Sequence, residues 1–314
     1  MSPYPIHRDF KKCAYMKPPL PPFLLPLING VLGRVTDGVK ASEGIRETKK
    51  IISGYGDGKI KLSLLEPKDI QKNAPCLLYF HGGAFMMKAT PFHKRLVCEY
   101  ALKAPCKVVF LDYRLAPQHA FPVGVEDCYA AFEWVYHNAE ALGIDRTRIA
   151  VGGDSAGGAL TAAISLMARD RRAPSPCFQM LIYPVTDARQ TTTSMQCFRD
   201  TPMWNSKLNE KMWRLYLSKG VPGKKEYASP LEAASFIDLP PAYVEVADFD
   251  CLRDEGIQYA EALNISGIPV ELNKTIGTVH GFDIMKNSDI VKECIYRRIG
   301  ALKKAFDPVE INSL

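Results

Sequence analysis

The sequence lacks any pair of cysteines at CxxC spacing, although it contains nine cysteines in 314 residues. Structural zinc sites commonly bind the metal through such pairs, so we expect no metal site. The number of cysteines is odd and no stretch reads as a secretory leader, which argues against a disulfide framework. We therefore expect reduced thiols and a cytoplasmic location.

Long apolar runs are also missing. The most apolar stretch near the N-terminus, PPFLLPLINGVLG, is interrupted by Pro21, Pro22 and Pro26 and is too short to span a bilayer. We expect residues 1–45 to form an N-terminal cap segment of helix and loop that packs on the main domain. Stable insertion into a membrane is not expected, whereas transient contact with lipid stays open.

A basic stripe is absent as well, although the formal net charge is +6. The lysines and arginines fall in scattered pairs, which are typical of a solvated surface and unlike a nucleic-acid site. Hydrophobic residues make up 47% and charged residues 24% of the chain, as in an ordinary globular protein. We expect no nucleic-acid partner, and the sequence leaves a homodimer open.

After residue 50, short β-rich runs alternate with helical periodicity, which predicts an α/β fold with a mostly parallel central sheet and helices on both faces. Residues 51–55 and 59–67 flank the turn GDG and predict an antiparallel hairpin. Six further strand candidates follow in the order CLLYF, KVVFL, RIAVGG, FQMLIYP, AYVEVA and VELNKT. We expect residues 46–314 to form one catalytic domain.

A long insertion separates two of these strand candidates. Residues 185–241 are too many for a plain crossover between neighbouring strands, so we expect a helical cap inserted into the domain. Its aromatic residues Trp204, Trp213 and Tyr216 are candidates for lining a substrate pocket, although most aromatic residues of this kind pack in a core.

The segment GGDSAGG, residues 152–158, follows the apolar run RIAV and precedes a good helix former. A serine in a strand-turn-helix context, with Gly153 and Gly157 on either side, predicts a nucleophile on a tight turn. The alternative, a phosphate-binding loop, would require a lysine after the glycines, where this chain has Ala159 and Leu160. Ser155 is therefore the candidate nucleophile.

The segment HGGAF, residues 81–85, follows a predicted strand and carries two adjacent glycines. Backbone N–H groups at such a strand end can stabilise a developing oxyanion, so Gly82 and Gly83 are candidate donors. The amide of Ala156, directly after the candidate nucleophile, is the third. Neighbouring apolar residues, which are weaker candidates for lining the substrate pocket, are Phe85, Met86 and Met87.

A serine nucleophile needs a general base, usually a histidine. Of six histidines only His280 lies downstream of Ser155, in a loop after the last predicted strand. The stretch VEVADFDCLRDEG, residues 244–256, lies between the two and holds five acidic residues. Asp248 or Asp250, after the predicted strand, could orient the histidine, whereas Asp254 and Glu255 suit the first turn of a helix.

Several motifs, in the order HGGAF, YRLAPQHAFP, GDSAG, DCLRDEG and HGF, resemble the hormone-sensitive-lipase-like family of α/β-hydrolase carboxylesterases. The resemblance covers about residues 62–306. It implies the α/β-hydrolase fold, a helical cap and a serine esterase that acts on small-molecule esters with short to medium acyl chains, without a cofactor. It also aligns Asp250 with the acid of the family's catalytic triad, beside Ser155 and His280.

The chain departs from the family's motifs at three positions. Ala84 replaces the third glycine of the oxyanion loop, Gln118 replaces an acidic residue, and Cys251 replaces a proline. None of these lies at a predicted triad position. Two alternatives remain at this point: an amidase or peptidase that uses the same triad, and a ligand-binding protein on the same fold.

Overall fold

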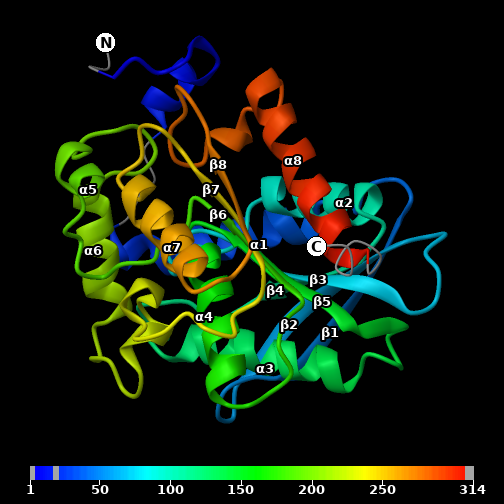
Figure 1. Ribbon diagram of the computed structural model, residues 1–314. Coiled ribbons are helices and arrows are strands. Elements are labelled where there is room, and N and C mark those ends of the chain that lie inside the picture. The colour runs from blue at the N-terminus through cyan, green and yellow to red at the C-terminus, as the bar shows by residue number, and fades with distance from the viewer. Residues whose placement is uncertain (1–3, 17–20, 308–314) are drawn as a thin grey trace.

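The computed structural model describes residues 4–16 and 21–307, with one mixed β-sheet through the middle (Figure 1). In this described part the sheet has eight strands in the order β1-β2-β4-β3-β5-β6-β7-β8. Their bounds are β1 Ile45–Ser53, β2 Lys59–Pro67, β3 Ala74–Phe80, β4 Lys107–Asp112, β5 Ile144–Asp154, β6 Phe178–Ile182, β7 Ala242–Val246 and β8 Val270–Lys274. The predicted fold class is confirmed. Residues 1–3 and 17–20 of the predicted cap segment, and residues 308–314, lie outside the described residues.

Only β2 runs opposite to the other strands of the described sheet. The pairs β1-β2 and β2-β4 are antiparallel, whereas every other neighbouring pair is parallel. The hairpin predicted from residue 51 is present, but its first strand begins earlier, at Ile45, which pairs with Pro67. The polar residues of the IRETKK segment hid this start, because β1 is an edge strand with much of its length exposed to solvent.

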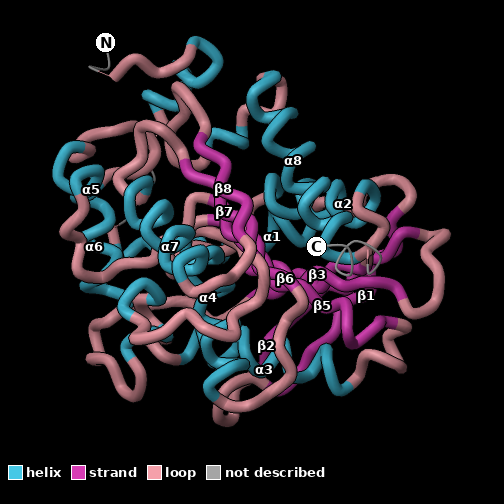
Figure 2. The backbone as a smooth tube through the Cα atoms, viewed as in Figure 1, coloured by secondary structure: helices cyan, strands magenta, loops and turns pink. Residues whose placement is uncertain are grey.

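Helices cover both faces of the sheet (Figure 2). Side chains on a strand point alternately to opposite faces, so Leu77 and Tyr79 of β3 pack with α2 and α8, while Leu78 and Phe80 pack with α3 and α4. The helices are α1 Leu25–Gly38, α2 Pro91–Lys103, α3 Val123–His137, α4 Ala156–Asp170, α5 Thr193–Cys197, α6 Ser206–Tyr216, α7 Arg253–Ile265 and α8 Asp289–Phe306. The described residues also form five short 3-10 helices: η1 Arg8–Tyr15, η2 Pro22–Leu24, η3 Lys225–Tyr227, η4 Pro230–Glu232 and η5 Phe282–Ile284.

An ion pair with a buried carboxylate joins the hairpin to the helical layer. The Arg114 guanidinium donates to both carboxylate oxygens of Asp127, at 2.7 and 2.8 Å. Asp127 is fully buried on α3 and also accepts the amide of Tyr55 in the β1-β2 turn. A buried carboxylate requires such partners, so this pair supports the fold.

The insertion at residues 185–241 carries α5, α6, η3 and η4, and α5 and α6 lie together beyond one end of the sheet (Figure 1). Its side chains Met195 and Trp213 are buried in the same core cluster as β3. The N-terminal segment touches the insertion, since the hydroxyl of Tyr4 donates to Asp200 Oδ1 at 2.6 Å. Two segments far apart in sequence thus meet at the same end of the molecule.

Candidate active site

Ser155 lies at the turn between β5, which ends at Asp154, and α4, which begins at Ala156. Its φ of 55° is in the left-handed region, where the backbone of any residue other than glycine is strained. A Cβ at Gly153 would lie 2.4 Å from the carbonyl oxygen of Phe80, and one at Gly157 would lie 1.9 Å from the same oxygen. Both flanking glycines are therefore needed for the tight turn that the sequence predicts.

A continuous hydrogen-bonded relay runs from Ser155 through His280 to Asp250. His280 Nε2 lies 2.9 Å from Ser155 Oγ, and His280 Nδ1 lies 2.6 Å from Asp250 Oδ2. A carboxylate only accepts hydrogen bonds, so the proton of the neutral ring belongs on Nδ1, and Nε2 is free to accept the serine hydroxyl. Asp250 is fully buried, which protects the relay from water.

Asp248, the other acid that the sequence left open, has different partners. Its Oδ2 accepts the amide of Gly277 at 3.0 Å, and its Oδ1 lies 3.9 Å from the guanidinium of Arg253. Asp250 is therefore the acid that the structure brings to the imidazole, while Asp248 ties the loop before His280 to the end of β7.

Aromatic rings hold the His280 imidazole in place. The Tyr183 ring meets it edge-on with a centroid distance of 4.8 Å, and the Trp204 ring lies 6.0 Å away. The Tyr183 hydroxyl donates to Asp283 Oδ1 at 2.8 Å, so this ring is itself fixed. Only 8% of His280 is exposed, which leaves the ring little freedom to turn away from Ser155.

In the loop after β3, the prediction of Gly82 as an oxyanion donor is corrected. The N–H of Gly82 donates to Asp154 Oδ1 at 3.0 Å, so it is not available to a developing oxyanion. A Cβ at Gly82 would lie 2.2 Å from Asp154 Oδ2, so this glycine is required for the close approach to Asp154 instead. The adjacency of Gly82 and Gly83 could not distinguish these two uses of a backbone amide.

The next two residues, Gly83 and Ala84, line the same cavity as Ser155. No described residue accepts a hydrogen bond from either of their amides. Ala84 has a φ of 57°, which explains why glycine is common at this position of the motif and shows that alanine is tolerated here. The amide of Ala156 begins α4 directly after Ser155, where a helix N-terminus leaves N–H groups free.

Asp154, the last residue of β5, anchors the loop after β3 through hydrogen bonds. It accepts the hydroxyl of Tyr79 at 2.9 Å, the amide of Gly82, and a hydrogen bond from His93 Nε2 at 3.2 Å. Burial alone would raise the pKa of Asp154, but the charge and hydrogen bond of His93, with the Tyr79 and Gly82 donors, outweigh burial and lower it to about 2. Asp154 thus carries a buried charge that fixes the loop beside Ser155.

The relay opens into a cavity of about 550 Å³. This volume is enough for a small organic ligand. Its wall combines the turn at Ser155, the loop after β3, the start of α2, and part of the insertion. The lining residues are Gly83, Ala84, Met87, Thr90, Pro91, Phe92, His93, Arg95, Asp154, Ser155, Tyr183, Met203, Trp204, His280, Gly281, Asp283, Ile284 and Lys286.

Two of the six residues predicted to line the substrate pocket, Met87 and Trp204, line this cavity. The other four belong to the buried core cluster and do not border the cavity; they are Phe85, Met86, Trp213 and Tyr216. The rings of Phe85 and Tyr216 stack with centroids 3.9 Å apart, so each ring covers apolar surface of the other. The prediction that these four residues line the pocket is corrected, because their side chains pack in the core.

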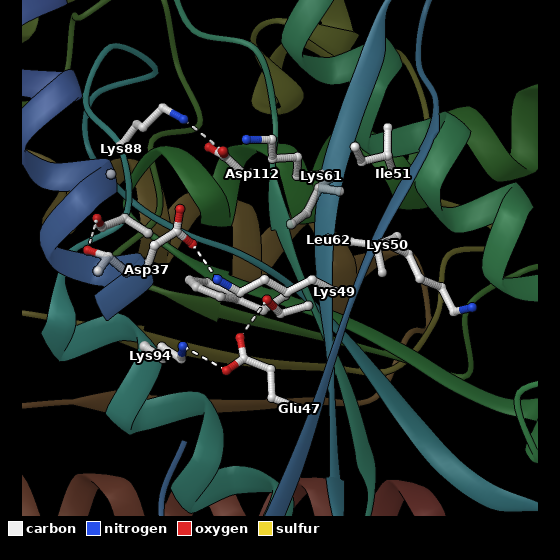
Figure 3. A pocket seen from close by; sticks show the side chains of 16 residues that line it. Asp37, Glu47, Lys49, Lys50, Ile51, Lys61, Leu62, Lys88, Lys94 and Asp112 are labelled. Atoms are coloured by element: carbon white, nitrogen blue, oxygen red, sulfur yellow. Dashed lines mark hydrogen bonds and ion pairs between the residues drawn. The ribbon is translucent and has the colours of Figure 1, made fainter. Parts of the chain in front are cut away.

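A second cavity of about 400 Å³ lies between α1, β1, β2 and the end of β4 (Figure 3). Lysines and carboxylates alternate along its wall, and most of them are paired with each other. The ion pairs are Lys49–Asp37 at 2.9 Å, Lys88–Asp112 at 2.7 Å and Lys94–Glu47 at 2.9 Å. No serine-histidine pair faces this cavity, so the cavity at Ser155 is the candidate active site.

Glu255 lies in the first turn of α7, as predicted, but it is not a solvated charge. Its position in the first turn of α7 suggests a charge at a helix start, but its side chain is fully buried. Its Oε1 accepts the amides of Thr186 and Asp187, whereas Oε2 has no hydrogen-bond partner among the described residues. Burial raises the pKa of Glu255 well above its ordinary value, which favours the neutral carboxyl.

Two features are absent from residues 4–16 and 21–307, the part of the chain that the structure describes. In that part of the chain, no group of three or more His, Cys, Asp or Glu side chains is arranged to hold a metal ion. None of the helices there is both long enough and apolar enough to cross a membrane.

The chain is similar to several proteins described as esterases. It is 36% identical to esterase LipI of Mycobacterium tuberculosis over 85% of this chain and 88% of that protein. It is 35% identical to an ethyl acetate hydrolase of Pseudomonas putida, over 69% and 68% of the two chains.

Solved structures agree with these relatives. A bacterial heroin esterase superposes with a TM-score of 0.88 at 32% identity, covering 96% of this chain and 98% of that one. A thermostable esterase from Pseudomonas putida also gives a TM-score of 0.88, at 30% identity, covering 98% and 99%. A family model described as the alpha/beta hydrolase fold matches residues 77–284. The chain therefore belongs to the alpha/beta hydrolase family, in the hormone-sensitive-lipase-like group of carboxylic ester hydrolases.

Proposed function

We propose that this protein hydrolyses carboxylic esters with short to medium acyl chains through an acyl-enzyme on Ser155. The observation that carries the proposal is the relay from Ser155 Oγ to His280 Nε2 and from His280 Nδ1 to Asp250, at 2.9 and 2.6 Å. The esterases to which the chain is similar support the same class of reaction.

In the first half of the reaction, Ser155 Oγ attacks the ester carbonyl while His280 Nε2 takes the hydroxyl proton. The imidazolium that forms is stabilised by the carboxylate of Asp250, which also keeps the ring in the required tautomer. The carbonyl oxygen becomes an oxyanion and accepts hydrogen bonds from backbone amides. The C–O bond to the alcohol then breaks, and His280 delivers its proton to the departing oxygen.

In the second half, water replaces the alcohol. His280 Nε2 takes a proton from this water as it attacks the acyl carbonyl, and the collapse of the second oxyanion releases the acid and returns the proton to Ser155. The same amides stabilise both oxyanions. No step requires a group other than those of the chain, the ester and water.

The amides proposed to bind the oxyanion are those of Gly83, Ala84 and Ala156. All three lie beside Ser155, and the first two face its cavity without another acceptor among the described residues. Loss of one such donor typically lowers the rate by about 10²-fold or more. Asp154 is proposed to act on these donors indirectly, since it fixes the preceding amide of Gly82.

Residues 185–241 and the N-terminal segment are proposed to form a cap over this cavity. Met203 and Trp204 of the insertion line it directly. From α1, the Asn29 side chain donates to the carbonyl of Met86 at 2.8 Å and accepts the amide of Lys88 at 2.9 Å. The N-terminal segment thus holds the far end of the loop that carries the proposed oxyanion donors.

A cytoplasmic location is proposed as well, and all nine cysteines being free supports it. A homodimer stays a prediction that sedimentation equilibrium would test.

The reaction is tested with 4-nitrophenyl esters from acetate to palmitate, each compared with the corresponding 4-nitroanilide. We expect turnover to be greatest for the short and medium esters and to fall below detection in Ser155→Ala. Faster cleavage of the anilides would favour the amidase alternative. Binding of the esters without turnover by wild type would favour a ligand-binding protein, and full activity of Ser155→Ala would refute the acyl-enzyme.

A further inference from the structure

Six acidic, basic or histidine side chains line the cavity at Ser155, and two of them, both basic, have no ionic partner among the described residues. Arg95 on α2 and Lys286, in the loop after η5, are both exposed. Neither forms an ion pair or a side-chain hydrogen bond with any described residue. They come from segments far apart in the sequence: Arg95 from the helix after the loop of Gly83 and Ala84, and Lys286 from the segment that follows His280.

The two carboxylates of the cavity wall do not balance these cations. Asp283 is fully buried, with Oδ1 accepting the hydroxyl of Tyr183 at 2.8 Å and Oδ2 accepting Arg298 at 2.7 Å. Asp154 is likewise buried, and its two oxygens are occupied by three internal donors. Both carboxylates are thus committed to partners within the protein.

The two histidines of the wall are also engaged. His280 belongs to the relay, and His93 bonds to Asp154 through Nε2 and to Thr90 through Nδ1. The α2 helix begins at the cavity, at Pro91, so its dipole adds a further partial positive charge on the same side as Arg95. The opening of the cavity is therefore positive, while its reacting groups are buried.

We propose that Arg95 and Lys286 select esters that carry a separate carboxylate, several bonds from the reacting carbonyl. This inference rests on the proposed ester hydrolysis at Ser155 and names its substrate class. The carboxylate would lie at the open end of the cavity, between the two side chains, when the ester carbonyl reaches Ser155. Because the cations are exposed, each is expected to contribute about two- to fivefold in kcat/KM and to lose its effect at high salt.

The test compares 4-acetoxybenzoate with 4-acetoxybenzamide, which has the same shape and the same acetyl ester but no charge. The readout is the ratio of kcat/KM for the anion to that for the amide. We expect this ratio to exceed one at low ionic strength and to approach one in about 0.5 M salt, because ions then screen exposed charges. In the double variant Arg95→Gln/Lys286→Gln it should fall by about fourfold or more.

The matched control is Lys72→Gln/Lys219→Gln, which removes two exposed lysines that do not line the cavity. We expect it to leave the ratio within about twofold of wild type, since distant exposed charges are screened. A ratio that changes less than about twofold in the Arg95/Lys286 variant, or equally in the control, would overturn the inference. If wild type hydrolyses neither compound, the proposed esterase function fails instead.

Discussion

Single atoms decide the shape of the turn at Ser155. The carbonyl oxygen of Phe80 is so close to α4 that a Cβ at Gly157 would lie 1.9 Å away, against backbone that cannot move freely. Gly300, on the exposed face of α8, has no atom within 4 Å of the same hypothetical Cβ. The same substitution therefore has opposite consequences at these two positions.

Gly157→Ala should lower the free energy of unfolding by about 3 kcal/mol or more, because the methyl group overlaps a backbone oxygen. Gly300→Ala should raise it by about 0.5–1 kcal/mol, because alanine favours a helix over the unfolded chain. Chemical denaturation of both variants measures the two effects. Equal stability of the two variants would contradict the close approach at Gly157.

Asp250→Asn should lower kcat by about 10⁴-fold, because the amide cannot hold His280 in the tautomer that accepts the serine proton. Asp248→Asn should lower it by less than about tenfold, since Asp248 binds the Gly277 amide rather than the imidazole. Steady-state kinetics with 4-nitrophenyl acetate compare the two variants. A larger loss of kcat in Asp248→Asn than in Asp250→Asn would show that Asp248, and not Asp250, orients the imidazole.

Helix α8 reaches the site through one buried side chain. Arg298 is fully buried and bonds Glu245 on β7, Asp283 in η5 and, at 3.4 Å, the hydroxyl of Tyr100 on α2. Asp283 follows His280 by three residues, so this cation connects the last helix to the loop that carries the base. Arg297, the preceding residue, pairs with Glu293 on the surface at 2.9 Å.

Arg298→Met should lower the free energy of unfolding by about 3–5 kcal/mol, because two carboxylates are left buried without their cation. Arg297→Met, the matched control, should change it by less than about 0.5 kcal/mol, since exposed pairs contribute little. Arg298→Lys should fall between them, because one ammonium cannot match the guanidinium fork. Urea denaturation gives all three values, and a loss in Arg297→Met as large as in Arg298→Met would contradict this account.

The stability of the whole molecule should depend on pH through Glu255. The pKa of Glu255 in the folded protein is raised above the unfolded value of about 4.5. The contribution of its neutral carboxyl to the free energy of unfolding is therefore fully present below about pH 4.5 and is lost as the pH rises through the folded pKa. Glu255→Gln mimics the neutral carboxyl and cannot ionise. Its free energy of unfolding relative to wild type should therefore increase as pH rises above about 4.5.

The control for this experiment is Glu261→Gln, on the exposed face of the same helix. This substitution should change the free energy of unfolding by less than about 0.5 kcal/mol, because the side chain is exposed to solvent. Denaturant titrations at several pH values measure both variants. A pH-independent difference for Glu255→Gln would show that its carboxyl is ionised in the fold.

Much of the fold could be predicted from the sequence, because local patterns carry it. Apolar runs marked the inner strands, and the buried residues Cys128, Ala131, Phe132 and Val135 of α3 follow one another at helical spacing in the sequence. The beginning of β1 was missed, since an edge strand with polar side chains has no apolar signal.

The sequence by itself determined the residue types and their order: a serine between two glycines, one downstream histidine, and an acid between them. It could not determine which backbone amides are free, because Gly82 and Gly83 differ only in that the folded chain brings Asp154 to one of them. Nor could it show that Trp204 lines the cavity whereas Trp213 does not, since both are aromatic side chains of one insertion. Hydrogen-bond partners and burial depend on residues distant in sequence, so only the tertiary structure decided them.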